Sequence, residues 1–392
     1  MKLKQDKTIG EVRSDVALDI EMAKEKGTKV VGCLCSYFPQ EMVRAAGAIS
    51  VGLCGTTEEK IELAEEIIPA DQCPMVKATY GRAISGNCLL FPLTDCIVGE
   101  TTCDGRKKMY ELMSREKPMH VMELPQMPDE KEALVHWIAE VRKLKNFIEY
   151  YVGEEITDKG LRNTIKQMNE ERKLLKEIHR CRRHNPVPIM GLDLVGLSTM
   201  FSYSIDRKIY KEKLTMLLEE LKQRINREEF ACSPKRPRIL WTGLGNSLGC
   251  DKVLRLVEEC GGVVVCQEGC GGITRIEDMV DEEKDPIEAI AERYLRVTCS
   301  CMTPNTRRFE DIDRLISEYT IQGVIDLTWQ SCHTFNIESY RVGELVKGKH
   351  SLPFLHIVTD FSQSDVGQLR VRIEGFLEQI TLGSKDATYR CA

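Results

Sequence analysis

Cysteine is the residue type in this chain that most plainly indicates chemistry. The 392 residues include 17 cysteines but only 7 histidines and 3 tryptophans. Six of the cysteines form two regularly spaced trios: Cys35, Cys73 and Cys103 are 38 and 30 residues apart, and Cys270, Cys301 and Cys332 are 31 and 31 apart. One strand–helix unit is roughly that long, so each trio can take one thiol from each of three units. In a reducing compartment, thiols at this density indicate metal or redox chemistry rather than disulfides.

The spacing of the cysteines also separates the classes of metal site. Zinc sites usually contain C-x2–4-C pairs, and bacterial ferredoxins contain C-x2-C-x2-C runs. This chain has no C-x-x-C, and its closest pairs are Cys33/Cys35, Cys299/Cys301 and Cys266/Cys270. Dispersed single cysteines therefore favour an iron–sulfur cluster held in a cleft between domains. Two alternatives stay open, namely thiols that bind no metal and pack as small hydrophobic groups, and a zinc site.

Composition excludes several other classes of protein. Lys and Arg number 55 and Asp and Glu number 61, which gives a net charge of −6 without any basic block, so we expect no nucleic acid partner. The longest nearly apolar stretch, residues 45–54, is about half a membrane span. The first residues, MKLKQDKTIGEVRSD, lack the apolar segment of a signal peptide. We therefore expect a cytoplasmic protein of two or three domains that does not enter a membrane.

The elements that position the thiols follow an α/β pattern. Short apolar strands are predicted at residues 29–35, 48–54, 95–100 and 118–124, and again at 238–243, 261–266, 322–329 and 352–360. Helical segments lie between them, including one at 56–68 with Thr56 and Glu59 in capping-box spacing. From about residue 128 to 230 the strands give way to three long helices. This pattern predicts two lobes with parallel, helix-flanked sheets of Rossmann or flavodoxin type: 1–127, a helical segment and linker at 128–235, and 236–392.

On this map, most of the six cysteines fall in strand-to-helix loops or at helix starts. In a parallel sheet such loops gather at the carboxyl ends of the strands, where ligands bind. Helix N-termini also stabilise thiolates and lower their pKa. Each lobe can therefore bring three thiols to one edge of its sheet, and the two edges can face one cleft.

Four segments carry a resemblance to a known family. CSYFPQEMVRAAGAISVGLCG (35–55), DCIVGETTCDGRKKMYEL (95–112), EGCGGITRIED (268–278) and SCHTFNIESYR (331–341) resemble motifs of the 2-hydroxyacyl-CoA dehydratase and benzoyl-CoA reductase family. The similarity extends over essentially the whole chain. Within the family, the chain most resembles the double-cubane cluster proteins.

The resemblance implies a cofactor and its ligands. Dehydratase subunits of the family commonly hold one [4Fe-4S] cluster with three cysteines, whereas double-cubane proteins hold an [8Fe-9S] cluster with six cysteines of one chain. We therefore predict that Cys35, Cys73 and Cys103 bind one cubane and that Cys270, Cys301 and Cys332 bind the other. The choices of Cys35 over Cys33 and of Cys301 over Cys299 stay open.

The resemblance also implies a partner and a reaction. An ATP-hydrolysing activator with its own [4Fe-4S] cluster would supply electrons to a homodimer of this chain, which would reduce small unsaturated molecules. The alternatives are a subunit of a 2-hydroxyacyl-CoA dehydratase and a non-catalytic electron-storage protein. The P-loop-like segment GELVKGKH (343–350) has His350 where Ser or Thr belongs and is interpreted as a helix end.

Other residues beside the cysteines are candidates for supporting roles. Gly271 and Gly272 would let backbone N–H groups approach a cluster. His333, Glu268 and Glu100 are the candidate proton donors. Each has a structural alternative: His333 could cap the following helix, Glu268 could be a solvated loop carboxylate, and Glu100 could pair with Arg106.

Overall fold

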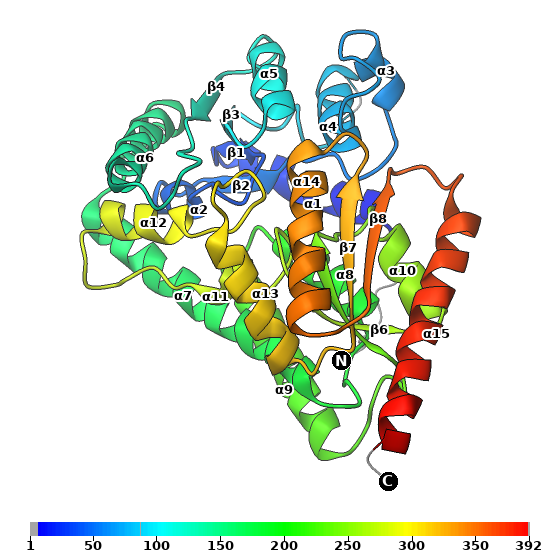
Figure 1. The fold of residues 1–392 in the computed structure, drawn as a ribbon. Helices are drawn as coiled ribbons and strands as arrows, with labels where there is room; N and C mark the ends of the chain where they lie inside the picture. Colours follow the sequence, from blue (N-terminus) through cyan, green and yellow to red (C-terminus); the bar gives the residue numbers. More distant parts are fainter. Residues whose placement is uncertain (1–6, 87, 391–392) are drawn as a thin grey trace.

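A computed structural model describes residues 7–86 and 88–390 of the chain (Figure 1). It contains two four-stranded sheets in which all paired strands run parallel. The first has the order β2-β1-β3-β4 and the second the order β6-β5-β7-β8. The predicted α/β class with two parallel sheets is therefore confirmed, and the two sheets share one topology.

All eight predicted strands form, within a few residues of their predicted ends. The strands are β1 (Val30–Cys33), β2 (Ile49–Gly52), β3 (Cys96–Glu100), β4 (Met119–Met122), β5 (Arg238–Gly243), β6 (Val263–Gln267), β7 (Gly323–Trp329) and β8 (Phe354–Thr359). The strands β3, β5, β6 and β7 are buried along their whole length, although β6 lies at the edge of its sheet. Their continuous apolar runs are what a sheet covered on both faces requires.

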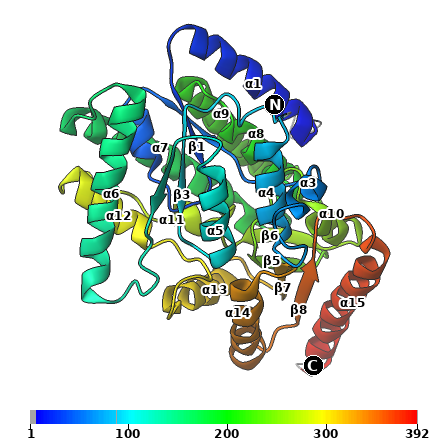
Figure 2. The ribbon, with the colours of Figure 1, turned by 90° about the horizontal axis from the view of Figure 1, so that it is seen from above.

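Helices cover both faces of the first sheet (Figure 2). One apolar core joins it to α1 (Ile9–Glu25), α4 (Pro74–Ile84) and α5 (Asp104–Met113), and the short α3 (Ile61–Glu65) packs on α4. The core on the other face contains α2 (Gln40–Ala45), α6 (Lys131–Val152) and α12 (Pro286–Leu295). Because α12 comes from the second half of the chain, the first sheet is completed by a helix distant in sequence.

The second sheet is covered in the same way. α10 (Lys252–Glu259) and α15 (Val366–Arg390) pack on one face, and α13 (Thr306–Glu318) and α14 (His333–Glu344) on the other. β7 shows the alternation that serves both faces, since Ile325 and Leu327 lie in the first of these cores and Val324 in the second. α11 (Thr274–Glu277) is a single turn after β6.

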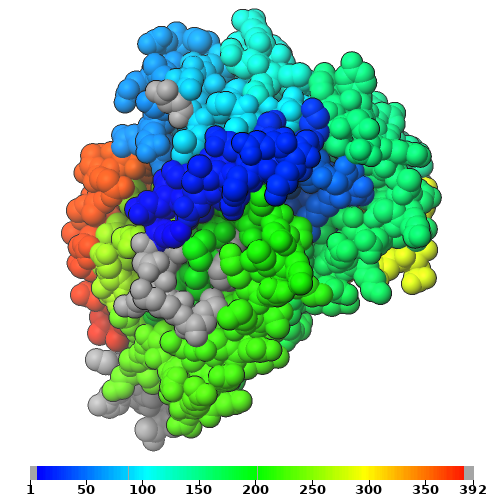
Figure 3. Space-filling view, turned by 180° about the vertical axis from the view of Figure 1, so that it is seen from behind, coloured from blue at the N-terminus to red at the C-terminus, as the bar shows by residue number. Residues whose placement is uncertain are grey.

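The predicted long helices of the middle segment are α6, α7 (Asp158–Arg180) and α9 (Arg207–Asn226), and α8 (Gly191–Ser202) lies between the last two. Viewed from behind, α1 (dark blue) lies across the boundary between the first lobe and this green helical segment (Figure 3). A π-helical turn at Leu345–Lys349 continues α14, which confirms that the P-loop-like segment belongs to a helix end. Within the described residues, no helix is long and apolar enough to span a membrane.

One predicted helix is wrong in extent. The capping box at Thr56 does not form, and α3 begins after Lys60, which has a left-handed φ of 68°. The Thr56 hydroxyl instead accepts a hydrogen bond from Arg13 at 3.0 Å. The Lys60 carbonyl packs so closely on α4 that a Cβ at Gly81 would lie 1.9 Å from it. Tertiary contacts of residues 56–60 therefore replace the local capping signal.

Candidate metal centre

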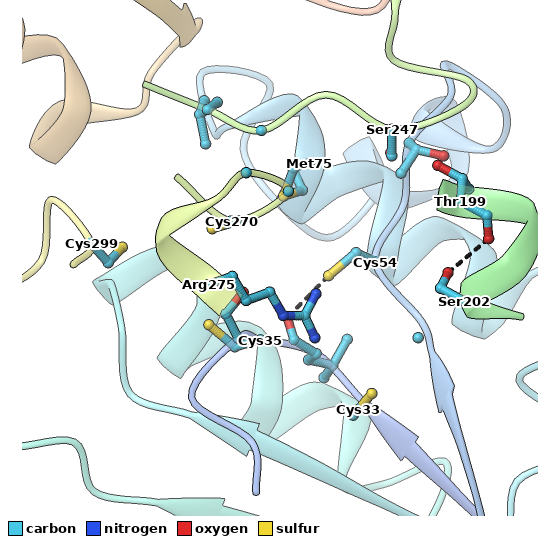
Figure 4. A pocket seen from close by; sticks show the side chains of 18 of the residues that line it. Cys33, Cys35, Cys54, Met75, Thr199, Ser202, Ser247, Cys270, Arg275 and Cys299 are labelled. Carbon is cyan, nitrogen blue, oxygen red and sulfur yellow. Dashed lines mark hydrogen bonds between the residues drawn. The ribbon is translucent and has the colours of Figure 1, made fainter. Parts of the chain in front are cut away.

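A cavity of about 850 Å³ lies between the two lobes, and all six predicted cysteine ligands line it. Cys35, Cys103, Cys270 and Cys332 follow the carboxyl ends of β1, β3, β6 and β7. The two sheets thus turn the same edge toward the cavity, as the position of the loops predicted. Figure 4 shows Cys33, Cys35, Cys54, Cys270 and Cys299 around it. The sequence did not single out Cys54 or Cys250, which also line the cavity.

Three of the thiols stand at helix starts. Cys73, Cys103 and Cys332 are the N-cap residues of α4, α5 and α14. The thiol of Cys332 donates a hydrogen bond to Cys73, so a thiol of each lobe meets the other directly. This bond, together with amide groups at the start of α4, lowers the pKa of Cys73 to about 7, and it raises the pKa of Cys332. One thiol of the pair therefore loses its proton readily, whereas removal of the second proton is unfavourable.

A second group of thiols gathers near Cys35. The pKa of Cys35 is raised well above the usual value by burial and by the nearby negative charges of Glu100, Cys270 and Cys299. The hydrogen bond from Cys299 to Cys301 and burial raise the pKa of Cys299. Burial raises the pKa of Cys270 to about 11. Cys35 of the first lobe thus has Cys270 and Cys299 of the second lobe as neighbours. The division of the six thiols between two cubanes stays a prediction.

Two arginines place positive charge among these thiols. Arg106 donates a hydrogen bond to the Leu34 carbonyl, and its Nη2 lies 3.5 Å from Cys54 Sγ and 3.2 Å from Met75 Sδ. Arg275 lines the cavity and lowers the pKa of Cys270 against the effect of burial (Figure 4). Guanidinium groups stay protonated at any physiological pH, so both favour an anionic group in the cavity.

The three candidate proton donors occupy different environments. His333 is exposed and lines the cavity. Glu268 is fully buried and is hydrogen-bonded to Arg308, so it is not a solvated loop carboxylate. Glu100 is fully buried, and neither of its carboxylate oxygens has a hydrogen-bond partner among the described residues. Burial raises the pKa of Glu100 to about 8, although the charge of Arg106 opposes the shift.

We expect Glu100→Gln to stabilise the metal-free protein at alkaline pH. The folded-state pKa of about 8 lies above the ordinary value of 4.5, so the cost of burying the carboxylate starts above pH 4.5 and is complete above pH 8. Glutamine avoids this cost, which at about 1.4 kcal/mol per pKa unit is on the order of several kcal/mol. Thermal unfolding should show a gain near about pH 9 and none near about pH 5. The same change at the exposed Glu62 is the control, and a gain that did not depend on pH would contradict the assignment.

The glycines of the Cys270 loop have a packing reason of their own. A Cβ at Gly272 would lie 2.0 Å from the Gln267 carbonyl oxygen, and one at Gly271 would lie 2.8 Å from the Asn246 carbonyl oxygen. The loop therefore needs glycine at 272 to fold back after β6.

Asn246 is a polar group that the sequence did not single out. It lines the cavity, is 4% exposed, and has no hydrogen-bond partner for its amide group among the described residues.

The donor set fits an iron–sulfur cluster better than a single ion. Within the described ranges, no three His, Cys, Asp or Glu side chains lie close enough to hold one metal ion. A cluster places its thiolates on different irons and so needs them spread around a larger volume. The thiols of six loops, the cationic Arg106 and the unpartnered Asn246 all border one cavity of about 850 Å³. An anionic inorganic group with several thiolate ligands matches this lining.

Known proteins resemble this chain over much of its length. The model of the 2-hydroxyglutaryl-CoA dehydratase D-component family (HGD-D) matches residues 35–380. A protein of Escherichia coli strain K12 named "Putative dehydratase subunit YjiM" is 38% identical over 370 residues, which cover 94% of this chain and 96% of that protein. The (R)-phenyllactyl-CoA dehydratase beta subunit of Clostridium sporogenes is 24% identical over 91% of this chain and 93% of its own. One of the benzoyl-CoA reductase subunits of Thauera aromatica is 26% identical over 42% of this chain and 43% of its own.

Proposed function

Because the chain belongs to the 2-hydroxyglutaryl-CoA dehydratase D-component family, we propose that it is an iron–sulfur reductase driven by a separate ATP-hydrolysing activator. The activator, itself a [4Fe-4S] protein, supplies low-potential electrons, and small unsaturated molecules accept them. The observation that carries the proposal is that one thiol from each of six loops lines a single cavity between the lobes. A homodimer is part of the proposal.

The proposed cofactor is an [8Fe-9S] double-cubane cluster on Cys35, Cys73, Cys103, Cys270, Cys301 and Cys332. When bound, it supplies the low-potential electrons of the reaction. Cys35 is preferred to Cys33 because the Cys33 thiol already donates a hydrogen bond to the Val51 carbonyl at 3.4 Å. A ligand must be a thiolate, so Cys33 would have to give up this hydrogen bond to bind metal.

The residues around the thiols have separate tasks in this proposal. Arg106 and Arg275 offset the negative charge of the thiolates, which would otherwise be costly in a cavity away from water. Of the candidate proton donors, His333 is preferred because it lines the cavity and remains exposed to solvent, so it can be reprotonated. Glu100 and Glu268 are buried behind the lining and are the weaker candidates for direct transfer.

A second candidate function is a 2-hydroxyacyl-CoA dehydratase subunit with one [4Fe-4S] cluster. It is favoured by relatives named as dehydratase subunits that align with more than nine-tenths of the chain. A non-catalytic electron store is the third candidate.

Anaerobic measurement of iron and acid-labile sulfide distinguishes these candidates. We expect about eight irons per chain for the double cubane, whereas about four would favour the dehydratase subunit. Reduction of a small unsaturated probe such as acetylene, with activator and ATP present, separates an enzyme from an electron store. Metal-free protein and a reaction without ATP are the controls. Absence of bound iron in oxygen-free material would contradict the proposal.

A further inference from the structure

We propose that Arg308 is a positioning residue that fixes the second lobe's thiol-bearing loops relative to one another. It lies in α13, behind the cavity lining, with a side chain that is 1% exposed. Three loops are concerned, those that carry Cys270, Cys299 with Cys301, and Cys332. The inference rests on the proposed function only for the identity of the group that these thiols bind.

The first link runs to the Cys270 loop. Nε of Arg308 donates to both carboxylate oxygens of Glu268, at 3.2 and 3.3 Å, and Nη2 donates to Oε2 at 3.1 Å. Glu268 directly follows β6 and stands two residues before Cys270. A planar guanidinium that grips a carboxylate with several N–H groups fixes its direction as well as its distance. The start of the Cys270 loop is thereby tied to α13.

The second link runs to the other two loops. Nη1 of Arg308 donates to Oε2 of Glu338 on α14, the helix that begins at Cys332. Glu338 Oε1 accepts a bond of 2.9 Å from the amide of Asn305, and the same amide donates to the Cys299 carbonyl at 2.9 Å. One chain of polar contacts therefore joins Arg308, the helix of Cys332 and the loop of Cys299 and Cys301.

The third link anchors the network to the sheet. Nη2 of Arg308 donates to the Thr242 hydroxyl at 3.0 Å, and that hydroxyl donates to Asp326 at 2.8 Å. Two buried carboxylates, Glu268 and Asp326, and the partly buried carboxylate of Glu338 thus surround one guanidinium. Removal of the cation from such a group leaves several carboxylates without compensation, which is costly in the interior. Lysine keeps the charge but cannot reach three carboxylates and a hydroxyl at once.

The chain offers a matched control in Arg238. It is equally buried, at 2% exposure, and begins β5 at the opposite end of the strand from Thr242. Its guanidinium donates to the carbonyls of Tyr319, Arg182 and His184. Arg238→Lys therefore removes a comparable buried network in the same lobe without touching a thiol-bearing loop.

The test measures the alkylation rate of each cysteine in the metal-free protein by peptide mass spectrometry. We expect Arg308→Lys to raise the rates at Cys270, Cys299 and Cys332 about tenfold relative to the rate at Cys103, the change expected for the loss of one charge-assisted hydrogen bond. Arg238→Lys should leave this ratio unchanged. A rise at all cysteines alike, or no rise at all, overturns the proposal.

Two milder variants cover the case in which Arg308→Lys does not fold. Glu338→Gln should raise the rates at Cys299 and Cys332 but not at Cys270, and Glu268→Gln should do the reverse. Indistinguishable patterns for the two variants overturn the proposal. In iron-loaded protein, Arg308→Lys should alter the electron paramagnetic resonance spectrum of the cluster and Arg238→Lys should not. If wild-type protein binds no iron, the proposed function fails. The alkylation ratios in metal-free protein still test the positioning role of Arg308.

Discussion

Cys332→Ser is expected to remove at least half of the bound iron, from about eight to about four atoms per chain or fewer. Cys332 begins α14 and donates a hydrogen bond to Cys73 from the other lobe, so it lies where the two halves of the site meet. Serine keeps the size and the helix start but offers no thiolate at neutral pH. Iron and sulfide analysis after anaerobic reconstitution measures the loss, and Cys73→Ser should show a similar one.

The control for this change is Cys232→Ser. Cys232 lies shortly before β5, is half-buried, packs against the core on one face of the second sheet and does not line the cavity. Its replacement should leave the iron content unchanged. Equal iron in Cys332→Ser and in wild-type protein would contradict a ligand set drawn from both lobes. Cys33→Ser and Cys35→Ser form a second matched pair, in which only the latter should lose iron.

Much of this site could be predicted because it follows from the geometry of parallel sheets. An apolar run of four to eight residues that ends in a loop places the next residue at the carboxyl edge of the sheet. This rule placed Cys35, Cys103, Cys270 and Cys332 correctly around one cavity. The helix starts at Cys73, Cys103 and Cys332 were also visible in the local sequence.

Contacts between distant segments could not be predicted in this way. α8 was missed because its N-terminus is capped from another helix, since the amides of Gly191 and Leu192 donate to Glu258 on α10. Glu268 was expected to be solvated or to donate protons, whereas its partner Arg308 lies forty residues further along. The position of α12 against α6 and the first sheet depends on the packing of a whole face. Local sequence patterns carry none of this information.

A clamp formed by Glu41, Arg172 and Tyr294 carries the second prediction. Glu41 on α2 is fully buried and accepts a bond of 2.5 Å from Arg172 on α7 and one of 2.8 Å from the hydroxyl of Tyr294 on α12. Burial alone would raise the pKa of Glu41, but the charges of Arg172 and Arg293 outweigh it, and the pKa is lowered. The clamp thus joins the first sheet, the helical segment and the second half of the chain at one carboxylate.

Glu41→Gln is expected to destabilise the protein by about 3–5 kcal/mol at neutral pH, because it leaves the buried guanidinium of Arg172 without its partner. A carboxylate with a lowered pKa stabilises the fold above its ordinary value of 4.5, and this contribution is lost as the pH falls through the folded-state pKa. The difference between variant and wild type should therefore be full at neutral pH and shrink below pH 4.5. Denaturant unfolding of the metal-free proteins measures it.

Glu170→Gln on α7, the helix that carries Arg172, is the matched control. Its carboxylate pairs with Lys211 at 2.6 Å, but both side chains are at least 40% exposed, so the loss should stay below about 1 kcal/mol. A similar small loss for Glu41→Gln would mean that the clamp does not hold the lobes together. A large loss that kept its size below pH 4.5 would instead assign the effect to packing rather than to charge. A large loss at neutral pH that shrinks below pH 4.5 would assign the effect to the charge of the buried Glu41–Arg172 pair.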